Sequence, residues 1–588
     1  YQPQFHAVHL SSIVIRARSR RYTYSEVMFM RSAKTFVPDA LRGLIASTDD
    51  IAWNPDPGYL TRARPLPRGR VALVSGGGSG HEPMHAGFIG EGMLTAVCPV
   101  LVFSSPNALQ IHEGSKAADA GGGVLHIVKN YTGDVMNFGI ARELLREDKI
   151  DTDVVLVDDD VATERADGSG PGRRGTAATI VVEKVCGASA ARGDDLAEGT
   201  RIGQHVAHSA RSMAVALRPC TLPGADEPSF DLPAGQMELG IGIHGERGTE
   251  RVDALPAPEL VRRLTDPIIK SLSLAEGDRV IAVVNGLGAT HPLELQLLFA
   301  ELGDYLDEQG IHIERTLIGT FVTALNMAGA SITLVRTDKE ILELWDAPTP
   351  APAWPNAIAR EYTGMGTRES FGPTFTPDTS RTAESSFVGS WIADWAEKVL
   401  DQEPALTDLD RRAGDGDFGT NMVAALDQLD ISAIRDTYST ATIFDAVSQA
   451  YLGHAGGTSG ALFGIWFRHF FRVAADSADS ELDLGAIAAA ARAGLDNITS
   501  LGGARVGDKT MVDAIVPAVE SLEQSVSSEA DRDAALASAA EAAAAGAEST
   551  ETMLANRGRA SYVGEAARGV VDPGALLIAW FFASAVGH

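Results

Sequence analysis

The chain has 588 residues, of which 45% are hydrophobic, and it carries a formal net charge of -29. This length allows about two to four folded domains, and the acidic balance excludes nucleic acid and anionic membrane surfaces as partners, since both require a basic footprint. No apolar run reaches the roughly 18 residues that span a bilayer. The three cysteines form no ligand cluster, which is typical of a reducing compartment. We therefore expect a cytoplasmic globular protein.

The first residues differ from the rest of the chain. Four arginines lie between Arg16 and Arg21, and no acidic residue precedes Glu26. An apolar piece precedes the arginines, which is the reverse of the order in a secretory signal peptide. We expect residues 1–31 to be a disordered or non-native extension that is dispensable for folding, with an organelle transit peptide as the alternative.

Short apolar runs then alternate with helix-like segments. Buried strands are predicted at 71–75, 96–103, 124–128 and 153–157, and helices at 105–120 and 135–147. Strands that alternate with helices predict a parallel sheet in an α/β fold, in which ligands bind at the loops that follow the strands.

A glycine-rich loop follows the first of these strands. The sequence SGGGSGHEPMH (75–85) holds four glycines, which allow backbone amides to approach a ligand closely. It is not the G-x-G-x-x-G loop of a dinucleotide site, and His81 lies at its end. The loop is predicted either to bind a ligand beside His81 or to be a tight turn with a capping histidine.

Two further loops carry candidate chemistry. Lys129 and Asp134 flank Gly133 after the third strand, either as part of a site or as a simple surface ion pair. Beyond an Ala-rich stretch (176–217), which is predicted to form two packed helices, the strand-like ELGIGI leads to His244 between two glycines. A histidine among glycines is reachable, as a nucleophile or ligand must be, although a structural role is the alternative.

A second α/β set and an all-helical region complete the chain. Strands are predicted in RVIAVVNGLGAT, IERTLIGTF and SITLVRT, and a Pro/Thr/Ser-rich segment from 346 to 386 has the composition of a linker. From 387 to 588 the strand signal is absent and apolar residues recur at helical spacing. The predicted fold is therefore multidomain, with an N-terminal region of two α/β subdomains followed by an all-α domain.

Three carboxylates lie close together in LDRRAGDGDFGTNM (409–422), where Asp410, Asp415 and Asp417 are separated by glycines. Hard oxygen donors of this kind suit Mg²⁺, which binds through a few carboxylates together with substrate phosphates. The apolar segment that follows predicts a helix whose first amides face the ion. A plain Asp/Gly-rich surface turn is the alternative.

Two more glycine-rich stretches interrupt the helices. HAGGTSGALFG (454–464) offers amides and two hydroxyls as a phosphate cradle, and LGGARVGDKTMVDAI (501–515) contains GDKT. The second stretch lacks the preceding strand and the spacing of a P-loop, so that interpretation is rejected.

Seven motifs in this order resemble the dihydroxyacetone kinase family, in its single-chain, ATP-dependent form. They are SGGGSGHEPMH, KNYTGDVMNF, GIGIHGERG, GDGDFGTNM, GGTSG, GDKTMVDA and GRASYVGE with DPGA. The chain departs from the family pattern at Arg247 and Val506, where the family has proline, and between Glu565 and Asp572. The resemblance implies a K-type dihydroxyacetone-binding domain at 32–345, a linker at 346–386 and an L-type ATP-binding domain at 387–588, folded as a helical barrel.

The resemblance also implies roles for individual residues. His244 would attack the ketone carbon and hold the substrate covalently, with Asp134, His81 and Lys129 as further catalytic residues. The substrate would be surrounded by Gly78, Ser79, Gly80, His81, Lys129 and Asp134. Two Mg²⁺ ions would bind Asp410, Asp415 and Asp417. ATP would be lined by Phe418, Gly419, Thr420, Asn421, Thr458, Ser459, Gly502, Met511, Arg559, Asp572, Pro573 and Gly574.

These roles imply ATP-dependent phosphorylation of a small ketose, most readily dihydroxyacetone, by a homodimer. A neutral imidazole is the nucleophile, so capture is expected to fade below the ordinary histidine pKa of about 6.5. The alternatives are a kinase for another short ketose such as erythrulose, an FMN cyclase that cleaves FAD, a form that takes phosphate from a phosphocarrier, and a non-enzymatic regulator.

Overall fold

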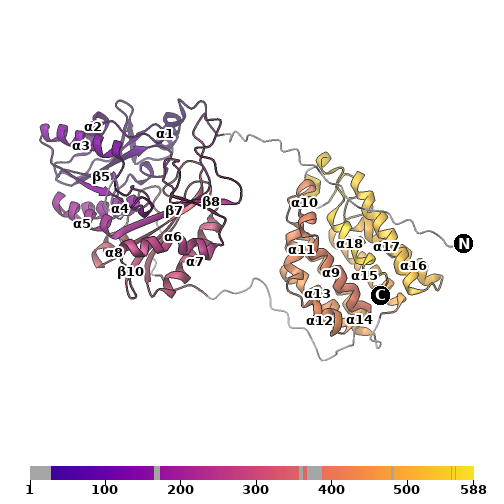
Figure 1. Ribbon diagram of the computed structural model, residues 1–588. Coiled ribbons are helices and arrows are strands. Elements are labelled where there is room, and N and C mark those ends of the chain that lie inside the picture. The colour runs from indigo at the N-terminus through magenta and orange to yellow at the C-terminus, as the bar shows by residue number, and fades with distance from the viewer. Residues whose placement is uncertain are drawn as a thin grey trace. The chain divides into compact units, whose positions relative to one another are not determined.

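The computed structural model describes residues 28–164, 172–355, 362–366, 387–477, 482–557, 559–562 and 564–587. The chain divides into two units, Tyr1–Thr367 and Arg368–His588, and every strand of the described residues lies in the first (Figure 1). Most of the predicted extension at 1–31, and most of the predicted linker beyond residue 355, fall outside the described residues.

The first unit contains two mixed six-stranded sheets. In sheet order, the first consists of β1 (Ile51–Asn54), β2 (Tyr59–Arg62), β4 (Ala96–Val100), β3 (Ala72–Gly78), β5 (Val124–Lys129) and β6 (Thr152–Val157). Strands β4, β3, β5 and β6 are parallel, as the sequence predicts, whereas β2 is antiparallel to both of its neighbours.

The second sheet is mostly antiparallel, and only β10 and β11 pair in parallel. In sheet order it consists of β11 (His312–Gly319), β10 (Arg279–Gly286), β12 (Ala328–Arg336), β7 (Ala210–Arg218), β8 (Gln236–Leu239) and β9 (Glu250–Asp253). The prediction of two helices across 176–217 is wrong at its end. Residues from Ala210 onward form β7, because they pair with β12 on one side and β8 on the other.

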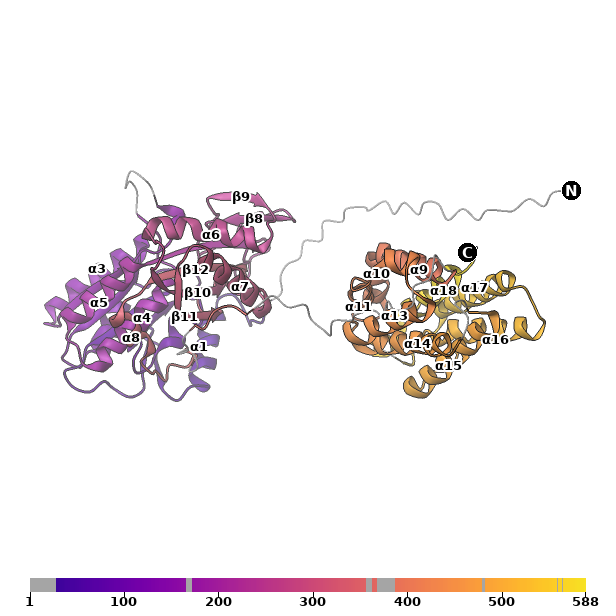
Figure 2. The same cartoon turned by 90° about the horizontal axis from the view of Figure 1, so that it is seen from below.

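Helices separate and cover the two sheets. α4 (Ala178–Arg192) and α5 (Leu196–Ser209) lie between them, so that Leu125 of the first sheet and Val283 of the second belong to one apolar core. α2 (Ala108–Ala118) and α3 (Thr132–Glu147) contact the first sheet. α6 (Ala257–Leu272) and α7 (Pro292–Glu308) contact the second sheet (Figure 2). α1 (Phe36–Ala46) contacts β1.

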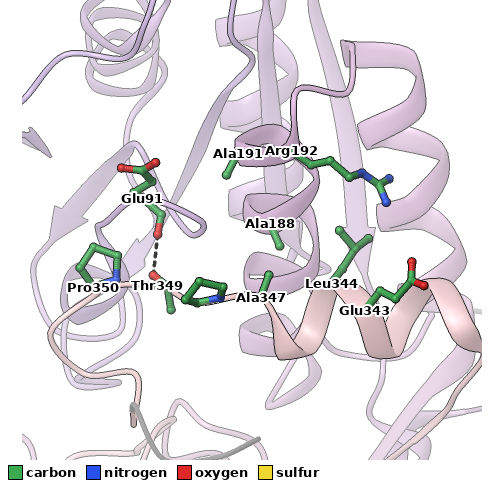
Figure 3. A pocket seen from close by; sticks show the side chains of 10 residues that line it. Glu91, Ala188, Ala191, Arg192, Glu343, Leu344, Ala347, Thr349 and Pro350 are labelled. Atoms are coloured by element: carbon green, nitrogen blue, oxygen red, sulfur yellow. Dashed lines mark hydrogen bonds between the residues drawn. The ribbon is translucent and has the colours of Figure 1, made fainter.

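The chain after α8 (Lys339–Asp346) packs on the first unit. The Trp354 ring lies 5.1 Å from Trp345, and the Ala353 amide donates to Gly87. A hollow of about 700 Å³ lies between this segment and α4 (Figure 3). The charged side chains that line it, Glu91, Arg192 and Glu343, are exposed, and the hydroxyl of its buried Thr349 already donates to the Glu91 carbonyl at 2.6 Å.

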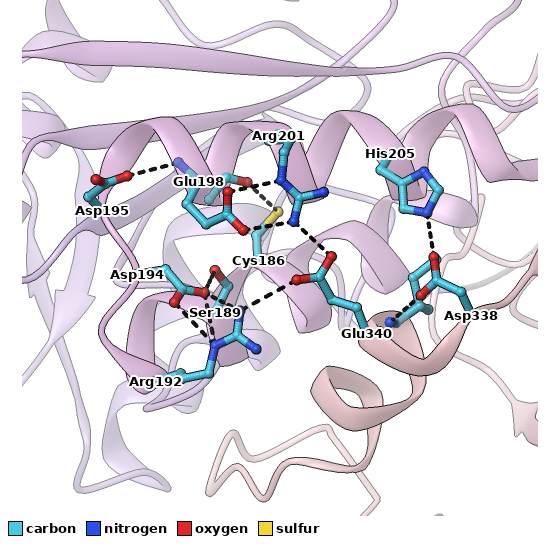
Figure 4. Close-up of polar contacts among 12 residues, drawn as sticks. Cys186, Ser189, Arg192, Asp194, Asp195, Glu198, Arg201, His205, Asp338 and Glu340 are labelled. Carbon is cyan, nitrogen blue, oxygen red and sulfur yellow. Dashed lines mark hydrogen bonds and ion pairs between the residues drawn. The ribbon is translucent and has the colours of Figure 1, made fainter.

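Ion pairs connect α8 to α4 and α5 (Figure 4). Arg201 lies 2.7 Å from both Glu198 and Glu340, and Arg192 lies 3.7 Å from the same Glu340 carboxylate. These side chains are partly or largely exposed, where ion pairs contribute little to stability. The apolar contacts of α4, which is buried from Ala178 to Ser189, therefore provide most of the stabilisation at this interface.

The second unit is a ring of helices, as predicted. In chain order its α-helices are α9 (Phe387–Asp401), α10 (Glu403–Ala413), α11 (Phe418–Leu426), α12 (Ile431–Asp436), α13 (Thr440–His454), α14 (Gly457–Asp476), α15 (Leu484–Gly502), α16 (Val512–Ser527), α17 (Arg532–Ser549) and α18 (Pro573–Ala583). Successive helices from α13 to α18 pack side by side, and α18 closes the ring against α9. There the Trp391 indole donates to the Phe581 carbonyl at 2.6 Å. No helix in the described residues is long and apolar enough to cross a membrane.

Replacing His126 of β5 with asparagine should weaken the acid sensitivity of the first unit. Burial lowers the His126 pKa from its ordinary 6.5 to about 3, so at acidic pH the unfolded chain binds a proton that the folded chain does not. Wild type should therefore lose about 2 kcal/mol through this group between pH 6.5 and 5, a loss that the variant escapes. At pH 7 the variant should be less stable, because the hydrogen bond to Ser115 is altered.

The measurement is urea unfolding followed by reaction of the thiols with a pyridyl disulfide. All three cysteines are buried in the first unit, so the signal reports that unit alone. An equal stability difference between wild type and variant at pH 7 and pH 5 would contradict the lowered pKa.

Candidate functional site

The loop after β8 presents His244. The backbone amide of His244 donates to Glu246 at 2.8 Å, and Arg174 donates to the same carboxylate at 3.1 Å. A Cβ at Gly242 would lie 1.8 Å from Glu246 Oε1, and Gly245 has φ +77°. Glycines at these positions therefore allow the Glu246 side chain to fold back beneath the histidine.

His81 lies edge-on to His244, with ring centroids 4.7 Å apart. His81 Nδ1 is 2.8 Å from the Thr323 carbonyl, and a carbonyl only accepts hydrogen bonds, so Nδ1 carries the proton. Nε2 is then an unprotonated acceptor, and it is buried without a hydrogen-bond partner among the described residues. Phe103 and Tyr131 also contact the His244 ring edge-on.

Both imidazoles are held neutral. Burial, together with the positive charges of Lys129 and Arg174, lowers the His244 pKa to about 3. Burial, His244 and Lys129 lower the His81 pKa well below its ordinary value. The pKa of about 6.5 expected for His244 is therefore too high, because an unperturbed pKa assumes an exposed ring. His244 keeps its nucleophilic lone pair down to about pH 4.

Lys129 and Asp134 form a buried pair, not a surface ion pair. Lys129 ends β5 and Asp134 lies in the first turn of α3, with Nζ 3.8 Å from Oδ2 and side-chain exposures of 0% and 4%. The amine also lies 3.0 Å from the Gly76 carbonyl and 2.8 Å from His85 Nε2. Neither His85 nor its partner Glu183 was a predicted site residue.

The glycine-rich loop is partly strand, because β3 runs through Gly78. A Cβ at Gly77 would lie 2.5 Å from Lys129 Nζ, and one at Gly78 would lie 2.6 Å from the Phe103 backbone. Gly78, Ser79 and Gly80 line a cavity of about 550 Å³ with apolar side chains of α1, and neither His81 nor His244 is in its lining. The glycine-rich loop nevertheless leads directly to the histidine pair, because His81 follows Gly80 in the chain and contacts His244.

The three aspartates of the second unit converge. One carboxylate oxygen from each of Asp410, Asp415 and Asp417 lies within 4.8 Å of the others. Burial raises the Asp410 pKa, and the charges of Asp415 and Asp417 raise it further, although the Phe418 amide opposes this by donating to Asp410 at 3.1 Å. Like charges held this close fit a divalent cation, and an all-oxygen donor set fits Mg²⁺.

Four helices begin at a cavity of about 240 Å³ beside these aspartates. Its lining includes the first residues of α11, α14 and α18 and the start of α16. The N-cap residues of α11, α14 and α16 make no side-chain cap. The first amides of α16 nevertheless donate to Thr510 and Met511, and the first amide of α11 donates to Asp410. The starts of α11 and α14 carry a partial positive charge, which suits the phosphates of an anionic ligand.

Most of the predicted nucleotide residues line this cavity. They are Phe418, Asn421, Thr458, Ser459, Gly502, Met511, Asp572, Pro573 and Gly574. Gly419 and Thr420 do not: a Cβ at Gly419 would lie 2.3 Å from Thr407, so the glycine lets α11 pack on α10, and Thr420 is exposed. The side chain of Arg559 lies outside the part that the structure describes.

Lys509, within the GDKT sequence, is a lining residue that the sequence did not predict. Its amine donates to the carbonyls of Thr550 at 2.6 Å and Val570 at 2.5 Å, so it connects two loops at the edge of the cavity. Burial raises the pKa of the neighbouring Asp572 to about 7, while Lys509 opposes that rise. A P-loop follows a β-strand, and the described residues of the second unit contain no strand, which agrees with the rejection of a P-loop at GDKT.

Comparison with known proteins agrees with this arrangement. Residues 42–353 match the Dak1 domain and residues 412–587 match the DAK2 domain. The "Triokinase/FMN cyclase" of Rattus norvegicus is 37% identical over 578 residues, covering 95% of this chain and 98% of that protein. The "L-erythrulose 1-kinase" of Mycolicibacterium smegmatis is 37% identical over 569 residues, covering 94% and 97%.

A solved structure is similar along the same length. The dihydroxyacetone kinase from C. freundii in complex with AMP-PNP and Mg²⁺ has a TM-score of 0.57 and 31% identity, covering 95% of this chain and 99% of that one. These matches confirm the resemblance that the seven motifs indicated. The chain belongs to the dihydroxyacetone kinase family, in the form that joins a Dak1 domain to a DAK2 domain.

Proposed function

We propose that this protein transfers a phosphoryl group from ATP to a terminal hydroxyl of a short ketose, most readily dihydroxyacetone. The observation that carries the proposal is the pair of neutral imidazoles, His244 and His81, whose rings lie 4.7 Å apart in the same unit as the buried Lys129–Asp134 pair. Relatives named as triokinases and erythrulose kinases support the same class of substrate.

Covalent capture by His244 explains why a ketone is required. A ring nitrogen forms a bond to the carbonyl carbon as the carbonyl π bond opens, and the ring N–H proton is transferred in net terms to the carbonyl oxygen. The product is a neutral hemiaminal, formed without a cofactor. Because glycerol has no carbonyl carbon, it cannot be captured in this way.

The neighbouring side chains would then act on the captured ketose. The unprotonated Nε2 of His81 would accept a hydrogen bond from a substrate hydroxyl, and Asp134 would take up the proton of the hydroxyl that is phosphorylated. Holding the ketose covalently fixes that hydroxyl and so reduces the entropy lost on reaching the transition state.

The aspartate cluster and the helix starts fit Mg²⁺ and ATP. Asp410, Asp415 and Asp417 would hold the metal, for which two ions are proposed. The uncapped starts of α11 and α14 would donate amides to phosphate oxygens. Bound Mg²⁺ would neutralise negative charge on the transferred phosphoryl group. The C. freundii kinase, crystallised with AMP-PNP and Mg²⁺, supports this assignment. A homodimer and a cytoplasmic location stay predictions.

The test is a coupled ADP-release assay with Mg²⁺ and ATP alone, run over three- and four-carbon ketoses, aldoses and glycerol. Dihydroxyacetone should give the highest kcat/KM, with erythrulose next. A dependence on a phosphocarrier, or equal turnover of glycerol, would contradict the proposal. Because several relatives are named triokinase/FMN cyclase, cyclic FMN release from FAD is the second activity to measure.

A further inference from the structure

Two buried residues stand behind Lys129 and have no role in the reaction described above. His85 Nε2 lies 2.8 Å from Lys129 Nζ, and His85 Nδ1 lies 2.5 Å from Glu183 Oε1. The side chains of His85 and Glu183 are 2% and 0% exposed. A continuous line of polar atoms therefore runs from Glu183 in α4 through the imidazole to the amine, and from there to Asp134.

When Lys129 is charged, the hydrogen-bond partners allow one proton arrangement. An ammonium group only donates, so with Lys129 charged, His85 Nε2 is the acceptor and Nδ1 carries the proton. Nδ1 then donates to an ionised Glu183. Ser75 is consistent with this tautomer, because its hydroxyl donates to the Ile127 carbonyl and its lone pairs are available to Nδ1 at 3.2 Å.

A second arrangement has the same number of protons. One proton passes from Lys129 Nζ to His85 Nε2, and the Nδ1 proton passes to Glu183 Oε1. Lysine, histidine and glutamate are then all neutral, no atom moves by more than a hydrogen-bond adjustment, and no proton is exchanged with solvent. Burial raises the Glu183 pKa to about 8 and lowers the Lys129 pKa, and both shifts favour the neutral arrangement relative to the charged one.

Other charges also face Lys129. Asp134 and Glu183 favour its charged form. Three imidazoles sense its charge, namely His81, His85 and His244. Because burial keeps these rings neutral, they add no positive charge around the amine. Burial of Lys129 itself is the largest effect and favours the neutral amine, and the two carboxylates oppose it.

We propose that Glu183 and His85 form a proton relay that sets the charge of the Lys129 amine during phosphoryl transfer. This inference rests on the proposed ketose kinase activity. Before transfer, an ionised Asp134 balances the ammonium. When Asp134 takes the substrate proton, the ammonium and the Glu183 carboxylate are left as a buried, separated ion pair, which is unfavourable in an apolar interior. The relay removes both charges at once. Glu183 and His85 are thus positioning residues that act through Lys129.

Glu183→Gln is the sharpest test, because glutamine keeps an oxygen for the His85 N–H but cannot take up a proton. We expect kcat for dihydroxyacetone to fall by about tenfold or more, with the ketose KM little changed. The alkaline limb of kcat/KM should move to lower pH by about one unit, since Lys129 loses a negative charge that stabilises its ammonium form. His85→Gln should move the limb the same way. Glu183→Asp, which keeps a carboxylate, should restore the wild-type pH profile.

Glu238→Gln is the matched control, since Glu238 is a buried glutamate that pairs with Arg251 at 2.7 Å. It should leave the pH profile unchanged. The relay is overturned if Glu183→Gln, with an unaltered thermal midpoint, keeps the wild-type kcat and alkaline limb. It is also overturned if Glu238→Gln produces the same shift. A wild-type chain that forms no ADP with any ketose would refute the proposed function itself, and the relay with it.

Discussion

Replacing Asp415 or Asp417 with alanine should abolish ketose phosphorylation, lowering kcat by about a thousandfold or more, while the ketose still binds at His244. The two aspartates contribute to the only cluster of this kind among the described residues. Removing one leaves too few oxygen donors for Mg²⁺. The imidazoles lie in the other unit and lose no contact. ADP release measures the first effect, and calorimetry of ketose binding without ATP measures the second.

Asp408→Ala provides the control for this prediction. Asp408 lies on the same helix, α10, but it is half exposed and pairs with Arg411 outside the cluster. Its loss should leave turnover within about twofold, as surface substitutions usually do. If Asp415→Ala keeps substantial activity, or if ketose binding is lost with it, the metal assignment or the separation of the two sites is wrong.

Replacing His244 with alanine should remove the discrimination between ketoses and glycerol. The ratio of kcat/KM for dihydroxyacetone over glycerol should fall by about a hundredfold or more, because only the carbonyl group distinguishes covalent capture from ordinary binding. Residual turnover can persist if His81, Lys129 and Asp134 hold the ketose without a covalent bond. Mg-ATP binding should be unchanged, since its residues lie in the other unit.

The pH dependence of this capture sharpens the prediction. Since burial lowers the His244 pKa to about 3, wild type should bind dihydroxyacetone equally well at pH 7 and at pH 5. An exposed histidine would lose most of its neutral form across that interval. His208→Ala, at an exposed position in α5, is the control. It should keep the wild-type ratio of kcat/KM for dihydroxyacetone over glycerol. An unchanged ratio in His244→Ala would make His244 a structural residue.

Much of the fold follows from local patterns in the sequence. The strands β3, β5 and β6 and the helical second unit were predicted because apolar periodicity and glycine placement agree there with the tertiary structure. β7 was missed because Ala210–Leu217 is rich in alanine and follows a helix directly, whereas its pairing partners, β12 and β8, lie later in the chain. Long-range pairing of this kind overrides local propensity.

The candidate site was predictable where glycines border a polar residue. His81 and His244 lie beside glycine-rich turns, and Lys129 and Asp134 flank the single glycine Gly133, which marks all four as candidates in the sequence. Glu183 lies instead inside the apolar run of α4. From sequence alone, a charged residue within a helix is expected to be exposed to solvent. A signal was present, however, because TAATIVVEKVCG has no polar face to keep Glu183 and Lys184 in solvent. The lowered His244 pKa could not be predicted, since it depends on burial and on the charges of Lys129 and Arg174, which lie far away in the sequence.

The most direct test of the central claim is the ¹³C NMR spectrum of dihydroxyacetone labelled at its carbonyl carbon and mixed with the full-length protein. Wild type and Asp417→Ala should both convert the ketone resonance into that of a bound tetrahedral carbon, since the bond to His244 needs neither ATP nor metal. His244→Ala should show only the spectrum of the free ketose. A tetrahedral signal that persists in His244→Ala, or a bound ketose that keeps its ketone resonance in wild type, would contradict covalent capture.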